Sequence, residues 1–191
     1  MTDLEHRLCK VLEPILESAD PRVRLSAYHD MPYAIFRYDP EQEFALRKQV
    51  TLLQTRLEGK GKRVHRISLA ECLDEAMRLQ HPLEEWFAAE REHGVETIVA
   101  TIHSVLAEHS PLTELVAKRM PAGAEPERDI VFVLRTGALF PAYRTFSLLE
   151  QLKGLVHVPT VLFYPGTLDG PSGLKFMGVL DAEHNYRPKI F

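Results

Sequence analysis

Hydrophobic and polar positions along this chain follow two patterns, one typical of strands and one typical of helices. The unbroken apolar run at 130–134, bounded by charged residues, predicts a strand buried on both faces of a sheet. Runs at 33–38, 64–67 and 158–164 predict further strands, and the last of them is rich in β-branched and aromatic residues. The tail at 186–191 predicts a short edge strand, since its proline is tolerated only there.

Between these runs, apolar residues recur every three or four positions, which is the spacing of an amphipathic helix. The first such pattern covers 4–16, and a second begins at Pro40 and ends at Gly59 and Gly61. The segment 73–120 has a helical pattern throughout, interrupted by proline and glycine. Because it is longer than an ordinary connection between strands, we expect a helical insertion or a lid there.

Strands that alternate with helices predict an α/β fold, with a mostly parallel sheet flanked by helices. We expect a single domain over 1–191, with the helical insertion at about 73–120 between the second and third strands. The 45% hydrophobic and 26% charged residues are typical of a globular protein. No apolar run approaches the roughly 20 residues that span a bilayer, and no signal peptide is visible, so we expect a cytoplasmic protein.

Candidate binding residues follow the two longest apolar runs. In open α/β sheets, loops at the carboxyl ends of strands line the crevice where ligands bind. One such loop begins at Arg135, and we expect a second, exposed loop at 165–173 that contacts a partner, with a tight connector between strands as the alternative. The predicted partner-binding residues are Arg135, Gly137, Phe140, Tyr143, Tyr164, Gly166 and Asp169, the two tyrosines as interface anchors.

Arg135 is the most informative of these candidates, because burying an unpaired charge is costly. One possibility is an ion pair with Asp169, Asp181 or Glu150. The other is a planar guanidinium that faces the carboxylate or phosphate of a partner. Both interpretations stay open on the sequence alone.

No recognisable catalytic set accompanies these loops. The glycine-rich motifs of nucleotide-binding folds are missing, and Arg135 stands where a magnesium-binding acid would follow the strand. The histidines include no HExxH or HxH pair, the serines lie outside a GxSxG elbow, and Cys9 and Cys72 lack metal-ligand spacing. We therefore expect a protein that is not an enzyme and that holds no cofactor and no metal.

The charge distribution bears on nucleic acid as a partner. A net charge of −4 provides no general attraction for DNA. The basic cluster at 60–66 contains Lys60, Lys62, Arg63 and Arg66, and a solvated turn explains it as well as DNA contact does. Because a phosphate footprint needs several convergent cations, we expect direct DNA contact to be weak or absent.

The last third of the chain resembles the BrxB family, small proteins encoded in BREX phage-defence operons. The resemblance is specific from Arg135 onward, whereas the N-terminal half is similar in pattern alone. It rests on Arg135-x-Gly137-Ala138-Leu139-Phe140-Pro141, Ser147-Leu148-Leu149-Glu150, Val158-Pro159-Thr160-Val161, Phe163-Tyr164-Pro165-Gly166-Thr167, and a tail with Asp181 and Tyr186-Arg187.

This resemblance implies a role alongside other BREX proteins and does not imply a chemical reaction. BREX systems methylate host DNA and block phage replication, and their other parts include a methyltransferase, a large AAA+ ATPase and the phosphatase-like protein PglZ. The resemblance implies a non-catalytic adaptor that binds the PglZ-like protein and the ATPase, with the methyltransferase as a further candidate and a homo-oligomer also compatible. Two alternatives stay open: a sensor that binds a nucleotide or another phosphate-bearing ligand without a P-loop, and a subunit that contacts DNA through 60–66.

Overall fold

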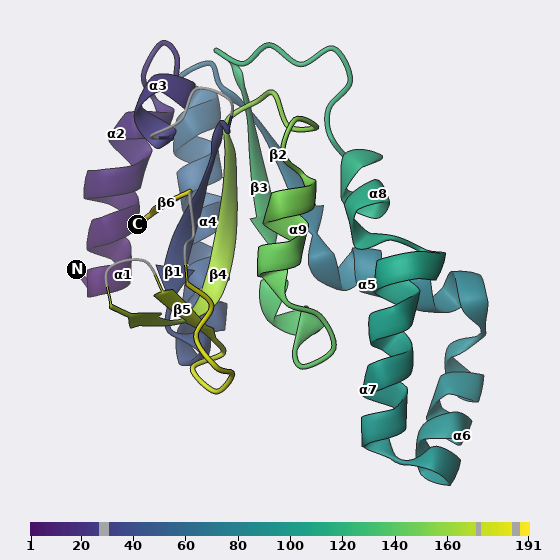
Figure 1. The fold of residues 1–191 in the computed structure, drawn as a ribbon. Helices are drawn as coiled ribbons and strands as arrows, with labels where there is room; N and C mark the ends of the chain where they lie inside the picture. Colours follow the sequence, from purple (N-terminus) through teal and green to yellow (C-terminus); the bar gives the residue numbers. More distant parts are fainter. Residues whose placement is uncertain (27–30, 171–172, 185–187) are drawn as a thin grey trace.

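The computed structural model describes residues 1–26, 31–170, 173–184 and 188–191. Within these residues, six strands form a sheet with helices on both faces (Figure 1). The strand order is β2-β3-β4-β1-β6, and every pair along this path is parallel. The predicted α/β fold with a mostly parallel sheet is therefore confirmed.

The centre of the sheet consists of the strands with the longest apolar runs. β1 (Tyr33–Tyr38) and β3 (Asp129–Leu134) are buried almost throughout, as is β4 (Thr160–Asp169) over its first seven residues. β2 (Arg63–Ser68) and β6 (Lys189–Ile190) lie at the two edges, and β6 pairs with β1. The predicted edge strand at the tail is confirmed at 189–190, while Tyr186 and Arg187 lie outside the described residues.

β4 is longer than the apolar run that predicted it, and this corrects the exposed loop expected at 165–173. The strand continues through Pro165 and Gly166, and the chain returns as β5 (Gly173–Phe176), antiparallel to β4. Gly166 lies opposite Phe176, and a Cβ at this position would collide with the carbonyl oxygen of Lys175. A glycine that resembles a turn residue in the sequence is thus required for close approach of two strands.

One face of the sheet is covered by the N-terminal helices and by α4 (Glu43–Gly59). Thr2 begins the first helix with a capping box, because its hydroxyl accepts from the amide of Glu5 and the Glu5 carboxylate accepts from the amide of Thr2. The rings of Phe36, Phe132 and Phe163 from three neighbouring strands pack in this core. The helices of this face are α1 (Asp3–His6), η1 (Arg7–Leu12), α2 (Glu13–Leu16), α3 (Arg22–Leu25), η2 (Pro40–Gln42) and α4.

The other face is covered by helices that follow β2 and β3. The chain between β2 and β3 is largely helical, and α6 with α7 forms a hairpin that stands away from the sheet in Figure 1. The helices that follow β2 and β3 are α5 (Leu69–Gln80), α6 (Leu83–His93), α7 (Val95–Ser104), η3 (Val105–His109), α8 (Leu112–Ala117), η4 (Thr136–Leu139) and α9 (Thr145–Gln151).

No helix in the described ranges is long and apolar enough to cross a membrane.

Candidate functional site

A crevice of about 290 Å³ opens at the carboxyl ends of β2 and β3, where α4 lies against the sheet. This is the part of a parallel α/β sheet in which ligands usually bind. Its apolar lining comes from Leu46 and Val50 on α4 and from Leu134 at the end of β3. Its charged lining comes from three arginines and two glutamates on four different segments, so polar groups converge on an apolar floor.

Glu43, at the start of α4, organises the inner end of the strand-end crevice. One of its carboxylate oxygens accepts a hydrogen bond from the hydroxyl of Tyr38. The other lies 3.1 Å from Nε of Arg47 and 3.5 Å from Nε of Arg135. Burial raises the pKa of Tyr38, and the hydrogen bond and charge of Glu43 raise it further, so Tyr38 stays a neutral donor. The charge of Glu43 is thus shared by two cations and a phenol.

Arg135 follows β3 in a left-handed conformation, with φ of 61° and ψ of 33°. Residues other than glycine rarely adopt this backbone conformation, because their Cβ comes too close to the following carbonyl oxygen. The next residue, Thr136, is buried and donates its hydroxyl to the carbonyl oxygen of Phe163 at 2.7 Å, which fixes the turn. Of the Arg135 side chain, 44% is exposed, and it points into the strand-end crevice.

Among the described residues, Arg135 forms no ion pair with any of its three expected partners, Asp169, Asp181 and Glu150. Asp169 pairs with Lys175 and His184, each at 3.5 Å. Arg135 instead contacts Glu43 through Nε, and its terminal nitrogens donate no hydrogen bond within the described part of the chain. Arg135 thus forms an ion pair within the chain through Nε, and its other guanidinium donors stay available for a partner.

Arg66 and Arg47 complete the cationic side of the strand-end crevice. Arg66, on β2, donates to the hydroxyl of Thr51 at 3.1 Å and has no carboxylate partner among residues 1–26, 31–170, 173–184 and 188–191. Arg47 lies over the ring of Phe44, with 5.4 Å between its guanidinium carbon and the ring centroid. Against these three arginines stand Glu43 and Glu71, so the lining has a formal net charge of +1.

The comparisons with known proteins identify the family. The BrxB family, described as BREX protein BrxB, matches residues 65–190. This chain belongs to the BrxB family. The curated BREX protein BrxB of Bacillus cereus (strain H3081.97) is 28% identical over 189 residues, which cover 98% of this chain and 96% of that relative. No solved structure matches the chain. The resemblance is confirmed, and the match begins well before Arg135.

Three of the predicted partner-binding residues are buried in this BrxB family member. Tyr164 is fully enclosed, and its ring centroid lies 5.4 Å from that of Phe176 on β5. Tyr143 and Gly166 are buried as well, and burial raises the pKa of Tyr143. The role of these tyrosines as interface anchors stays a prediction, but in the folded chain both lie in the core, Tyr143 beside His103 and Tyr164 beside Phe176.

Gly137 and Phe140 are half-buried and lie away from the strand-end crevice. A Cβ on Gly137 would meet the sulfur of Met177 at 3.5 Å, and the ring centroid of Phe140 lies 6.0 Å from that of Phe176. These residues and Asp169 therefore cluster with β5 and the turn after it, while Arg135 faces α4. The partner-binding role of these residues stays a prediction.

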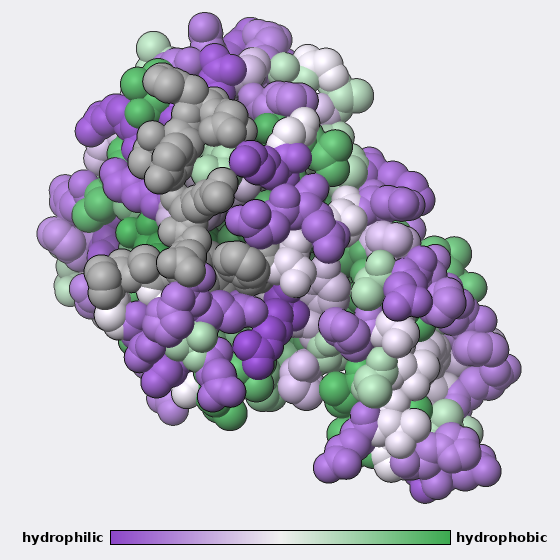
Figure 2. Space-filling model, viewed as in Figure 1, coloured by the Kyte–Doolittle hydropathy of each residue, from purple (hydrophilic) through white to green (hydrophobic). Residues whose placement is uncertain are grey.

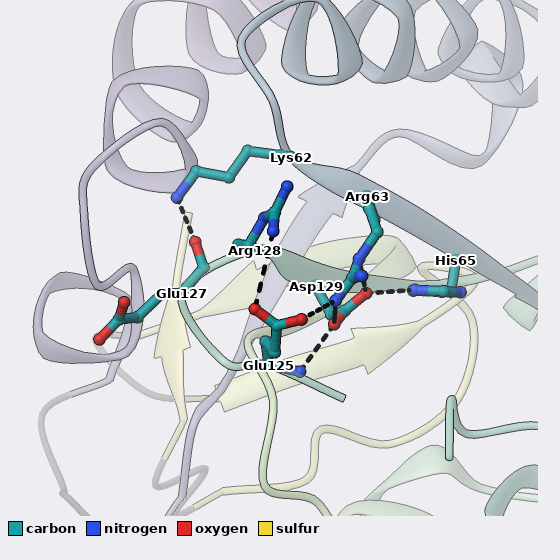
Figure 3. Close-up of polar contacts among 7 residues, drawn as sticks. All are labelled: Lys62, Arg63, His65, Glu125, Glu127, Arg128 and Asp129. Carbon is teal, nitrogen blue, oxygen red and sulfur yellow. Dashed lines mark hydrogen bonds and ion pairs between the residues drawn. The ribbon is translucent and has the colours of Figure 1, made fainter. Parts of the chain in front are cut away.

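Most of the basic residues at 60–66 are engaged within the fold (Figure 3). Arg63 donates from Nε to Asp129 at 2.9 Å, and the ring of His65 lies 2.7 Å from the same carboxylate. Lys62 donates to the backbone carbonyl oxygens of Ser18 and Glu127 at 2.6 and 2.7 Å. These cations thus stabilise the amino ends of β2 and β3, which leaves them poorly placed to bind DNA.

The carboxylate of Asp129 is the centre of this network. Its side chain is 3% exposed, and it also accepts from the backbone amide of Glu125 at 2.7 Å. Burial by itself raises the pKa of Asp129, but the hydrogen bonds from Arg63, His65 and the Glu125 amide outweigh burial and lower the pKa to about 2. The group is therefore ionised at any physiological pH.

The sequence interpretation missed the crevice role of Glu43, Arg47 and Arg66. Glu43, Arg47 and Thr51 recur every four residues after Pro40, which places them on one face of a helix. That spacing was a usable signal, but the strand that this face would meet depends on the order of strands in the sheet. Within the described residues, no three His, Cys, Asp or Glu side chains gather as metal ligands.

Proposed function

We propose that this protein is a non-catalytic adaptor of a BREX system, which binds other BREX proteins such as the PglZ-like protein and the AAA+ ATPase. Membership of the BrxB family supports a place among BREX proteins. The observation that carries the adaptor role is the α6–α7 hairpin, an element that projects from the sheet and leaves an apolar groove open to solvent.

The hairpin buries very little of itself. Among residues 83–104, Trp86 and Ile98 are buried, and the two helices are joined at Gly94, whose φ of 84° favours glycine. A groove of about 320 Å³ lies between the helices, and its apolar floor includes Trp86, Ala89 and Ile98. Phe87, on the same helix, is 54% exposed. Exposed apolar surface rimmed by polar residues is typical of a protein–protein interaction site.

A helix of a partner fits a groove of this kind. Grooves between two helices commonly take the apolar side of an amphipathic helix. Trp86 is held in place because its indole nitrogen donates to the carbonyl oxygen of Met77 at 3.1 Å. Because only 6% of Trp86 is exposed, this side chain fixes the floor of the groove and offers little contact area of its own. The groove therefore has an ordered floor on which a helix of a partner can lie.

The charge of the hairpin indicates the character of the partner. Five glutamates and one arginine between 83 and 104 give a formal net charge of −4, which equals that of the entire chain. Figure 2 shows hydrophilic residues along the outer edge of the hairpin, with paler and apolar residues between them. Opposite charges across an interface steer association and select partners. We propose that the hairpin receives a basic amphipathic helix of another BREX protein.

The buried thiol agrees with a role without covalent catalysis. Burial raises the pKa of Cys72 to about 11, although its neighbour Arg119 acts in the opposite direction. A nucleophilic cysteine needs a lowered pKa, because the thiolate is the reactive form. Cys72 lies on the buried face of α5 instead, together with Leu69 and Ala76.

Co-purification from cells that carry a complete BREX operon tests the adaptor role. The test variant is Thr97→Arg with Thr101→Arg, which places two cations in the groove to block it and to repel a basic helix. Both threonines are exposed and bond backbone carbonyls one turn earlier within the hairpin, so we expect folding to persist. The matched control, Val23→Arg with Thr55→Arg, adds the same charge at exposed positions on α3 and α4.

We expect the tagged wild-type protein and the control to recover a BREX partner and the hairpin variant to lose it, with equal circular dichroism spectra for all three. Recovery of no BREX protein by the wild type would overturn the adaptor role. Partner recovery by the hairpin variant at the wild-type level would remove the observation on which the proposal rests. Metal-dependent turnover that follows the protein through purification would show that it is an enzyme.

A further inference from the structure

The strand-end crevice collects arginines from three separate elements. Arg47 comes from α4, Arg66 from β2 and Arg135 from the turn after β3. Each guanidinium carries five N–H donors in a planar fork. We propose that this crevice binds a small organic anion, whose phosphate or carboxylate group accepts hydrogen bonds from Arg66 and Arg135 while its apolar part lies against Leu46 and Leu134.

The donor groups needed for such a ligand are available. Arg66 uses one nitrogen for the hydroxyl of Thr51, and Arg135 directs Nε at Glu43 over 3.5 Å. The remaining N–H groups of both side chains meet no acceptor in the described part of the chain. Charge-assisted hydrogen bonds from arginine to phosphate or carboxylate are strong and geometrically specific. Both side chains are exposed, so these N–H groups face solvent and are available to an anion that enters the crevice.

The glutamates of the crevice limit the charge of the ligand. Glu43 accepts from Tyr38 and faces two arginines, so its charge is already matched. Glu71 lines the crevice at the first turn of α5 and repels additional negative charge there. With a lining of net charge +1, the site suits an anion with one acidic group, whereas a triphosphate or a nucleic-acid backbone would meet repulsion.

The dimensions and lining of the crevice limit the size of the ligand. A volume of about 290 Å³ lies at the lower end of the range of ligand pockets, which is roughly 300–1,000 Å³. Leu46, Val50 and Leu134 provide an apolar floor that inorganic phosphate alone would not cover. An acid of about the size of a single aromatic ring fits both the volume and the floor.

The backbone at Arg135 gives independent support. A left-handed residue with a Cβ is strained, and such strain occurs preferentially at ligand-binding sites. Glycine would adopt φ of 61° without strain. The chain instead holds arginine at this position, where its side chain reaches both Glu43 and the crevice.

Titrations followed by two-dimensional NMR of the full-length protein test this proposal. The probes are phenyl phosphate and benzoate, which present the two acidic groups on the same ring, with benzylamine as a cation of similar size. We expect saturable shifts of the amide signals of Ser68 and Thr136 with the anions and none with benzylamine. Whichever anion binds more tightly identifies the acidic group of the natural ligand.

The variants Arg66→Gln and Arg135→Gln separate binding from folding. We expect each to weaken anion binding about tenfold, because each removes one charge-assisted interaction. The control Arg78→Gln removes an equal charge from an exposed pair with Asp74 on α5 and should bind as the wild type does. Unchanged circular dichroism confirms folding for all three variants.

Two results would overturn the proposal: no saturable shift with either anion, or equal binding by the wild type and the double variant of Arg66 and Arg135. Neither result depends on BREX partners, because the hairpin groove and the strand-end crevice share no lining residue. Failure of the anion site therefore leaves the adaptor role standing, and the reverse also holds.

Discussion

The charged side chains at the two ends of the β2–β3 pair differ in how many hydrogen-bond partners they have. At the amino end, Arg63 and His65 surround one buried carboxylate, and almost every donor and acceptor has a partner (Figure 3). At the carboxyl end, Arg66 and Arg135 border an open crevice with few partners. The same two strands thus carry a satisfied hydrogen-bond network at their amino ends and an open crevice with available N–H donors at their carboxyl ends.

This difference shows that unmet hydrogen-bonding capacity marks a candidate site better than charge does. The basic segment 60–66 contains more cations than the crevice, yet Lys62 and Arg63 are engaged by backbone oxygens and by Asp129. Satisfied buried networks rigidify a fold and leave nothing for a ligand. The crevice has fewer cations, but their donors face open volume.

The largest effect is expected at the amino end, from Asp129→Ala. This change removes the acceptor of Arg63, His65 and the Glu125 amide. We expect the free energy of unfolding to fall by roughly 2–4 kcal/mol, below the loss for a fully buried pair because Arg63 still reaches water. Urea denaturation measures the change.

The matched control for Asp129→Ala is Glu127→Gln, since Lys62 contacts only the backbone carbonyl of Glu127 in this network. That variant should lie within about 0.5 kcal/mol of the wild type. A loss for Asp129→Ala as small as that of the control would contradict the contrast between the two ends.

The next effect is the pH dependence of the same network. The folded pKa of Asp129, about 2, is depressed below its ordinary value of 3.8, so its stabilisation is present above about pH 4 and is lost as the pH falls through 2. We expect a contribution of about 2 kcal/mol over this window. It is measured as the difference between wild type and Asp129→Ala, which should shrink from pH 5 to pH 2. A difference that does not vary with pH would show that the charge of Asp129 is not what stabilises the network.

A smaller effect is expected at the carboxyl end, from Arg135→Gly compared with Arg135→Ala. Both variants remove the guanidinium, but glycine relieves the left-handed conformation and alanine does not. We expect the glycine variant to be more stable than the alanine variant by about 1 kcal/mol. Both should bind phenyl phosphate about tenfold more weakly than the wild type. Equal stability of the two variants in urea would show that the turn after β3 is not strained.

The smallest effect is expected for Arg66→Gln, within about 0.5 kcal/mol of the wild type, since exposed polar contacts contribute little to stability. Arg63→Gln makes the same substitution three residues earlier on β2 and removes contacts to Asp129. We therefore expect Arg63→Gln to lower the melting temperature more than Arg66→Gln does. The reverse order would mean that Arg66 is structural and that the crevice is not a free site.

The strands were predictable where burial decides them and less so where pairing decides them. β1 and β3 are enclosed by the two cores, so unbroken apolar runs mark them in the sequence. β4 continues past Tyr164 because β5 pairs with its second half. Pro165 and Gly166 favour turns by local preference, and this tertiary pairing overrides that preference.

The contacts of the candidate site depend on the order of strands, which the hydrophobic pattern does not specify. Arg135 meets Glu43 because β1, which leads into α4, lies in the same sheet as β3 with β4 between them. Likewise, Arg63 lies directly opposite Asp129 in the parallel register of β2 and β3. A prediction of that register would have revealed the closed network, and the composition of 60–66 alone did not.

The position of β1 within the sheet has a consequence for synthesis of the protein. Tyr33 lies opposite Thr160, and Ile35 lies opposite Ile190, so both neighbours of β1 are translated more than 120 residues after it. At roughly 5–20 residues per second, this apolar segment leaves the ribosome and remains unpaired for on the order of ten seconds. The pairing of β1 therefore has to wait for the final part of translation, and an unpaired apolar strand is prone to aggregation until then.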